Sequence, residues 1–395
     1  MGLKRLLTLI VFILASIPSA ATFAEMPLTL DDAVIDIRLT SNSFAMLDNG
    51  SFILAGEDAN AAPTDDTIVA VMCCVDLNGC ILWRYELGDT NTRNGFYDVS
   101  VLENGDVQVM HMVQQKNASP KQYLLRIREG ELVFDTELDP SANHVTAVGD
   151  EILIQTTVSS SRTEEGYYLY RHALTLFTHD FKEKWSREYE DVFTLTGILP
   201  INDGYILYGS IDGQHGDFYQ YIARLDTNGH VLWSHRTSND NARYFDAVEA
   251  ENGDIIAVGG IYAAGDGSSY PIAQISCYSS TGELQWEKEQ HDDEYGILFD
   301  AVANVPDGYV AVGVNAVEER NVRVVHYDKN GNVIFAWNEP LNDGFNFVQY
   351  IDLQMIHDEV YAIVTADYLP YPEDTNRDRI VYRTTVKNIH YRSPL

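Results

Sequence analysis

The stretch YFDAVEAENGDIIAVGGIYAAGDGSSYPIAQISCYSSTGELQWE, residues 244–287, decides the fold. It holds four short runs rich in β-branched and aromatic residues, at 245–250, 254–258, 272–278 and 283–287. The first two runs are joined by the turn ENGD and the last two by STGE, in which a glycine supplies the positive φ of a tight hairpin. Apolar residues show no helical period here, so the stretch predicts one four-stranded antiparallel sheet.

The same unit recurs along the chain. A turn of the STGE kind precedes an aromatic residue about every fifty residues, at Trp83, Phe134, Trp185, Trp233, Trp286 and Phe335. A second turn, mostly Asn-Gly or Asp-Gly, lies upstream in each unit, near residues 50, 105, 149, 204, 253, 308 and 358. Four-stranded repeats of about fifty residues are typical of β-propeller blades.

Seven upstream turns predict an all-β fold, a seven-bladed β-propeller of four-stranded antiparallel blades, with six or eight blades as the alternatives. We expect the blades to begin near residues 41, 96, 144, 193, 244, 297 and 348, within a single domain over 25–395. The last unit has a short outer strand, so we expect residues 34–39 to complete it and join the two ends of the ring.

The repeat unit DAVxxxNGDIIAVGG, residues 246–260, together with ARLDTNGHVLW, residues 223–233 of the preceding copy, resembles the exported bacterial β-propeller repeats described as quinoprotein-like or tryptophan–aspartate-like. The resemblance covers the chain beyond its first residues and implies the propeller fold. Its turn at 226–229 is one residue shorter than the docking motif of quinone-binding propellers, so we predict no cofactor, with Ca²⁺ as the candidate ion.

Residues 1–24 combine a short positive start, the apolar run LLTLIVFILA and small residues before Glu25. This composition is typical of a secretory signal peptide, with an uncleaved anchor as the alternative. We therefore expect a secreted, extracellular or cell-envelope protein. The formal net charge of −33 disfavours nucleic acid, and no later stretch is apolar enough for stable membrane insertion.

The recurring aromatic residues and a recurring aspartate are the candidates that the repeat singles out. The aromatics are expected to wedge between blades, with a ligand platform as the alternative reading. Asp98, Asp246, Asp300 and, less regularly, Asp352 open the first strand of their units, which lines the channel of a propeller. These channel-mouth acids either attract a cation or accept backbone N–H groups, and we favour the second interpretation.

One loop combines ligand-binding residue types with a weak metal pattern. Asp374, Asn376 and Asp378 alternate as in a calcium loop, without the glycine and the final acid that such loops carry. Tyr368 and Tyr371 lie on the same Pro-containing stretch and are the candidate ligand-binding residues. Tyrosines in 166–172 and 217–225 offer further contact surface.

The four cysteines, at 73, 74, 80 and 277, lack metal or redox spacing, and we expect buried free thiols, with a Cys74–Cys80 bridge as the alternative. No motif of a catalytic site is present, and we name no catalytic residue.

The sequence favours a secreted, non-enzymatic, monomeric binding or scaffold module that engages a protein or polysaccharide partner through one face of the ring. The alternative is a propeller enzyme, quinoprotein-like or carbohydrate-active, whose residues come from several blades.

Overall fold

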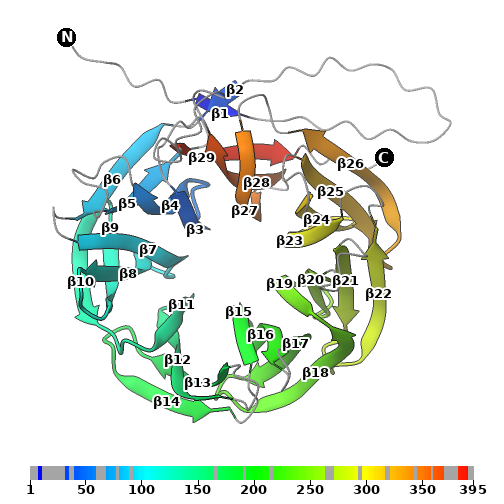
Figure 1. Ribbon diagram of the computed structural model, residues 1–395, viewed down its shortest axis with the longest axis horizontal. Coiled ribbons are helices and arrows are strands. Elements are labelled where there is room, and N and C mark those ends of the chain that lie inside the picture. Colours follow the sequence, from blue (N-terminus) through cyan, green and yellow to red (C-terminus); the bar gives the residue numbers. More distant parts are fainter. Residues whose placement is uncertain are drawn as a thin grey trace.

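The computed structural model describes most of the chain as strands and tight turns. The described residues are 8–10, 32–34, 40–58, 68–76, 80–88, 92–162, 168–189, 193–212, 217–262, 271–291, 296–315, 321–340, 345–356, 359–368 and 381–389. Among them no helix is long and apolar enough to cross a membrane. Six four-stranded antiparallel sheets stand around a central axis, which is the arrangement of a β-propeller (Figure 1).

The six blades follow one another along the chain, each with its first strand innermost and its fourth outermost. Blade 1 is β3 (Thr40–Met46), β4 (Phe52–Asp58), β5 (Val69–Val75) and β6 (Ile81–Leu87); blade 2 is β7 (Thr92–Val101), β8 (Val107–Gln115), β9 (Lys121–Arg128) and β10 (Glu131–Glu137); blade 3 is β11 (Ala142–Val148), β12 (Glu151–Arg162), β13 (Tyr168–Phe177) and β14 (Glu183–Glu188). Blade 4 is β15 (Phe193–Ile201), β16 (Gly204–Asp212), β17 (Phe218–Asp226) and β18 (Val231–Asp240); blade 5 is β19 (Ala242–Glu249), β20 (Ile255–Ile261), β21 (Ile272–Tyr278) and β22 (Leu284–Gln290); blade 6 is β23 (Ile297–Val305), β24 (Gly308–Asn315), β25 (Asn321–Asp328) and β26 (Val333–Pro340).

A three-stranded sheet, β27 (Phe345–Ile356), β28 (Glu359–Tyr368) and β29 (Val381–Ile389), lies between blades 6 and 1 (Figure 1). The predicted count is therefore corrected: the structure shows six four-stranded blades, not seven. The seventh turn signal does fall in a sheet, but the residues after it supply only three described strands. A turn signal marks a hairpin, and it carries no information on whether an outer strand follows.

The N-terminal pair β1 (Thr8–Ile10) and β2 (Asp32–Val34) forms a separate antiparallel ribbon beside β29. Val34, the first residue of the segment expected to complete the last blade, pairs with β1 in this ribbon. Residues 35–39 of that segment lie outside the described residues.

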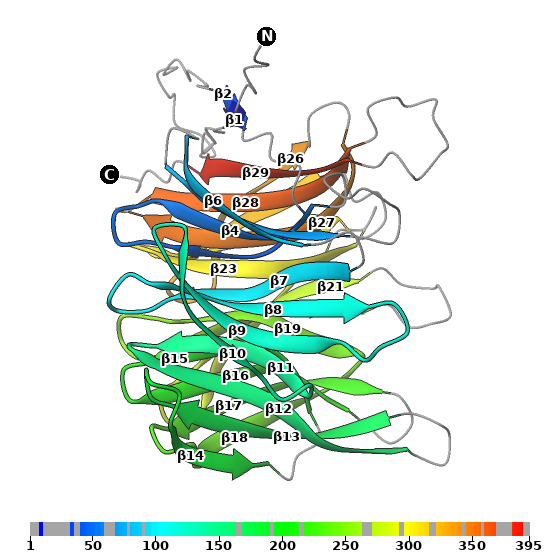
Figure 2. The ribbon, with the colours of Figure 1, turned by 90° about the vertical axis from the view of Figure 1, so that its left-hand side faces the viewer.

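Burial follows the order of the strands within a blade. The second and third strands are buried along nearly their whole length, as in β20 and β21, whereas the outermost strands β10 and β18 alternate between exposed and half-buried residues. The hydrophobic clusters each join two neighbouring blades; one combines Ile53 and Met72 of blade 1 with Phe96 and Leu125 of blade 2. The sheets therefore stack face to face around the ring, in the side view of Figure 2 as in Figure 1.

The two ends of the ring differ in what they carry. Tight turns join the first strand to the second and the third to the fourth; in blade 5 these turns contain Gly253 (φ 81°) and Gly282 (φ 89°), in the left-handed region that favours glycine. We call this end the hairpin face. At the opposite end, which we call the entry face, the first strand begins and the second strand ends, as the pairing of Ala242 with Ile261 shows.

Candidate functional site

The first strand of each four-stranded blade has an irregular register of the β-bulge type, and three predicted channel acids lie at or next to it. The irregularity lies at Asp98 in β7, next to Asp246 in β19 and at Asp300 in β23. Asp98 adopts a positive φ of 49°. A bulge bends its strand and turns a side chain away from the regular pleat, so the repeated aspartate is placed by local backbone geometry.

Asp98 links its own blade to the next one. Its Oδ2 accepts a hydrogen bond from the backbone N–H of Val145 in blade 3 at 3.0 Å and lies 3.3 Å from Nδ1 of His144. Nε2 of His144 lies 3.3 Å from the carbonyl oxygen of Leu195 in blade 4. A carbonyl oxygen only accepts, so both ring nitrogens donate when His144 is protonated. Burial alone would lower the pKa of His144, but the Asp98 carboxylate and the Leu195 carbonyl raise it overall.

Asp246 repeats this interaction between blades 5 and 6. Its Oδ2 accepts from the N–H of Val302 at 2.9 Å, and its Oδ1 accepts from the N–H of Ala247 at 2.8 Å and from the Tyr208 hydroxyl at 3.4 Å. Burial raises the pKa of Asp246 to about 7, against the lowering effect of these donors.

Asp300 has fewer donors. Its pKa is also raised to about 7 by burial, with the backbone of Val314 as the opposing hydrogen bond. Within the described part of the chain no three His, Cys, Asp or Glu side chains gather at metal-binding distance. Asp98 and Asp246 thus serve as acceptors that fasten one inner strand to the next.

The other predicted site residues lie in the last sheet or beyond it. Asp352 is in β27, where its backbone pairs with Ile363, and Tyr368 ends β28 opposite Phe345, at the entry face. Tyr371 and the predicted metal ligands Asp374, Asn376 and Asp378 lie outside the described residues.

The recurring tryptophans pack on the outer turn of the following blade. The Nε1 of Trp185 donates to the carbonyl of Thr227 at 3.0 Å, and the Nε1 of Trp233 donates to that of Ser280 at 3.1 Å. A Cβ atom added to Gly282 would lie only 2.6 Å from the Trp233 ring. The repeated glycine therefore leaves the space that the aromatic ring of the preceding blade occupies. Trp83, Trp286 and two phenylalanines, Phe134 and Phe335, hold the same sequence position in their blades.

Three cysteines are buried free thiols, Cys73, Cys74 and Cys277. Cys80 is also free, and its exposure corrects the expectation that all four thiols are buried. The Asp76 carboxylate accepts a hydrogen bond from the Cys80 N–H at 2.7 Å, and Cys80 directly precedes the outermost strand β6. Burial raises the pKa of Cys74 to about 11.

An aromatic cluster that the repeat analysis did not single out lies at the entry face of blades 4 and 5. We call Phe218, Phe245, Tyr262 and Arg243 the Tyr262 cluster. The Tyr262 ring meets those of Phe218 and Phe245 edge to face, at centroid distances of 5.6 and 6.3 Å, and the Arg243 guanidinium lies 5.4 Å from the Phe218 centroid. All four residues are half-buried.

Arginines contact residues of the Tyr262 cluster and their neighbours in the sequence. The Arg236 guanidinium covers the ring of Tyr219 at 3.8 Å, and Nε of Arg243 donates to the Ser210 hydroxyl at 3.2 Å. Burial raises the pKa of Tyr262, and the Asp300 carboxylate adds to this effect while Arg243 opposes it. The residues of the cluster come from strand ends in two different blades, so no local sequence motif predicts it. The tyrosine-rich segment 217–225 was the one sequence signal near it.

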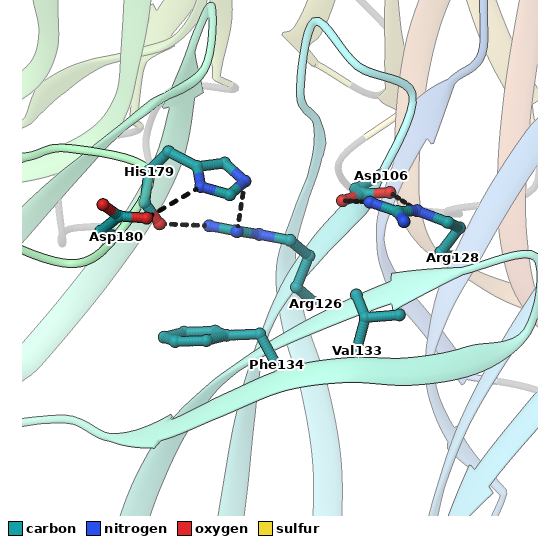
Figure 3. Close-up of a pocket in the computed structure, with 7 residues that line it drawn as sticks. All are labelled: Asp106, Arg126, Arg128, Val133, Phe134, His179 and Asp180. Atoms are coloured by element: carbon teal, nitrogen blue, oxygen red, sulfur yellow. Dashed lines mark hydrogen bonds and ion pairs between the residues drawn. The ribbon is translucent and has the colours of Figure 1, made fainter.

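A cavity of about 380 Å³ opens at the hairpin face between blades 2 and 3 (Figure 3). Its lining is Asp106, Arg126, Arg128, Val133, Phe134, His179 and Asp180. Arg126 donates through Nη1 to Nε2 of His179 at 2.8 Å and through Nη2 to the His179 carbonyl at 3.1 Å. Arg128 pairs with both carboxylate oxygens of Asp106, at 2.7 and 2.9 Å.

Comparison with known proteins bears on the fold and not on the function. No family model matches the chain, and no curated protein sequence matches it. Among solved structures, Sqt1 of Saccharomyces cerevisiae superposes with a TM-score of 0.50 at 9% identity, covering 84% of this chain and 82% of Sqt1. At this identity the likeness supports the β-propeller fold and nothing further.

Two other solved structures show a weaker similarity. The neuraminidase-like N10 protein of a little yellow-shouldered bat influenza A virus has a TM-score of 0.45 at 10% identity, covering 76% of this chain and 93% of that one. BBS1N, in complex with ARL6DN, has a TM-score of 0.42 at 11% identity, covering 83% of this chain and 91% of that one. The six four-stranded antiparallel sheets around a central axis place the protein in the structural class of β-propellers.

Proposed function

We propose that this protein is a binding or scaffold module that engages a protein or polysaccharide partner at the entry face, through the Tyr262 cluster. The observation that carries the proposal is a group of half-buried aromatic rings beside arginine at the ends of strands from two blades. Tyrosine and arginine are enriched among the residues that dominate binding energy at interfaces, because they combine a large rigid surface with polar groups.

The position of the cluster suits recognition. The ring holds the strand ends rigidly, so contact residues lose little conformational freedom on binding. Tyr368, the predicted ligand-binding residue of β28, ends its strand at the same face as Tyr262. A formal net charge of −33 favours a basic protein or a neutral polymer over an anionic partner.

The test presents purified protein to immobilised basic proteins and neutral polysaccharides and compares the Phe218→Ala/Tyr262→Ala variant with wild type. Removing two interface aromatics is expected to weaken binding by about tenfold or more. Leu132→Ala/Leu232→Ala is the control, since both are exposed apolar residues near the hairpin-face ends of the outermost strands of blades 2 and 4. Equal binding by the double variant and wild type would reject the cluster as the contact surface.

A carbohydrate-active enzyme is the second candidate, and one observation favours it. Asp246 and Asp300 lie on neighbouring blades, and both have a pKa raised to about 7, as a general acid requires near neutral pH. Hydrolysis of aryl glycosides by wild type and its loss in Asp300→Asn would support this candidate. Binding of a polysaccharide without turnover would leave the binding module as the function.

We also propose that residues 1–24 are a signal peptide and that the mature protein acts outside the cell or in its envelope, in keeping with the resemblance to exported propeller repeats. The apolar run of about ten residues after Lys4 and Arg5 supports this. The test is the N-terminal sequence of protein recovered from the medium or envelope of an expressing cell. A start near Glu25 supports export, and an intact Met1 in all fractions contradicts cleavage.

A further inference from the structure

The cavity between blades 2 and 3 contains a buried arginine without a carboxylate partner. Arg126 is 3% exposed, and no carboxylate oxygen of the described residues accepts a hydrogen bond from it. Nη1 and Nη2 each use one N–H on His179, and Nε has no partner, so three of its five N–H groups are uncommitted. Asp106, Asp150 and Asp180 act on this charge without accepting a hydrogen bond from it. A buried charge that lacks a hydrogen-bonded counter-charge is costly, so this guanidinium favours an anion.

Arg224 of blade 4 is the equivalent of Arg126 in the repeat, and it does have a carboxylate partner. Each arginine pairs across its hairpin with the repeat aromatic of its blade, Arg126 with Phe134 and Arg224 with Trp233. Nη2 of Arg224 reaches both oxygens of Asp203, at 2.6 and 2.9 Å. Each arginine also donates to a carbonyl in the outer turn of the next blade, Arg224 to that of Ser280 and Arg126 to that of His179, and Nε lacks a partner in both. The difference is that the remaining Nη of Arg224 meets the Asp203 carboxylate, whereas that of Arg126 meets the His179 ring.

The cavity has room and lining for the missing carboxylate. Arg126 and Arg128 alternate on β9 and so point to the same side, with Arg128 60% exposed at the mouth. Asp106 accepts hydrogen bonds from Nε and Nη2 of Arg128 and none from Nη1. The Phe134 ring lies under the Arg126 guanidinium at 5.1 Å, and Val133 completes the apolar side (Figure 3). A volume of about 380 Å³ falls in the range of small-molecule sites.

We propose that this cavity binds a small organic acid, whose carboxylate is held by Arg126 and Arg128 and whose apolar part lies on Phe134 and Val133. The carboxylate takes the role that Asp203 has beside Arg224. His179 keeps its place between the guanidinium and Asp180, whose Oδ1 lies 3.6 Å from Nδ1. The site is at the hairpin face and is independent of the Tyr262 cluster.

Calorimetric titration of the full chain with benzoate at low salt tests the proposal, with benzamidine as a probe of the same shape and opposite charge. Benzoate is expected to bind and benzamidine to show no heat. Binding of benzamidine, or of inorganic phosphate but not benzoate, would overturn the assignment of an organic carboxylate.

A matched pair of surface variants locates the site without disturbing the buried arginine. Val133 and Leu232 are exposed residues that precede the repeat aromatic of blades 2 and 4, at 46% and 57% exposure. Val133→Glu adds a negative charge at the cavity and is expected to weaken benzoate binding by about tenfold. Leu232→Glu adds the same charge elsewhere and should leave it unchanged. Equal affinity in both variants would place any binding outside this cavity.

Discussion

Replacing Asp300 by asparagine should remove a large part of the pH dependence of stability in this protein. Burial raises the pKa of Asp300 from 3.8 to about 7, while the unfolded chain retains the ordinary value. Because the folded state binds this proton more tightly, the stabilising contribution is fully present below the unfolded pKa and falls as pH rises toward 7. Between pH 5 and pH 8 the linkage amounts to about 2–3 kcal/mol in the free energy of unfolding.

The assay is urea denaturation of wild type and Asp300→Asn at pH 5 and pH 8, in the same ionic strength. Asparagine keeps the shape of the side chain and cannot ionise, so the variant should lose about 2–3 kcal/mol less than wild type across this interval. Glu251→Gln is the control, because Glu251 is an exposed carboxyl group on the turn of blade 5. If Asp300→Asn follows wild type at both pH values, Asp300 does not bind a proton near pH 7 and the argument from its burial fails.

Two further substitutions test how neighbouring blades are held together. His144→Gln should destabilise the protein more at pH 6 than at pH 9. The pKa of His144 is raised in the folded state, so the charged His144–Asp98 contact contributes its full stability below the unfolded pKa of about 6.5, and this stability is lost as pH rises through the folded pKa. Denaturant titration at the two pH values measures the difference, and an equal loss at both would contradict it. Gly282→Ala should cost about 1–3 kcal/mol, since it combines a φ of 89° with contact against the Trp233 ring. Gly105 is the control, because it has a φ of 82° and nothing lies within 4 Å of an added Cβ, so Gly105→Ala should cost only the backbone strain, about 1 kcal/mol. Equal losses of stability for the two variants in thermal melts would show that contact with the Trp233 ring adds nothing to the cost of Gly282→Ala.

Much of the fold follows from local chemistry and could be predicted. Asn-Gly and Asp-Gly turns, alternating β-branched residues and a repeated aromatic mark hairpins wherever they occur, so the four-stranded unit and its propeller assembly were readable in residues 244–287. The number of complete blades could not be predicted in this way, and the prediction of seven was wrong. A turn signal near residue 358 says nothing about whether a fourth strand lies outside β29.

The candidate sites could be predicted only in part, because their members come from different blades. Asp98 and Asp246 were noticed for their repeated position, but their partners are backbone groups of the next blade, Val145 and Val302, which no local pattern names. The Tyr262 cluster was missed for the same reason: its rings lie on β17, on β19 and directly after β20, and they meet only when two sheets stack.

The amino-acid sequence by itself determined the repeat, the hairpins and the positions of the recurring aromatic residues, since these depend on backbone preferences and on spacing within one unit. The closed ring decided which groups lie between blades and what they find there. Arg126 and Arg224 occupy the same repeat position, but Arg224 bonds the Asp203 carboxylate, whereas Arg126 bonds His179 and lines a cavity. That difference arises from side chains about twenty or more residues away that only the tertiary structure brings within hydrogen-bonding reach.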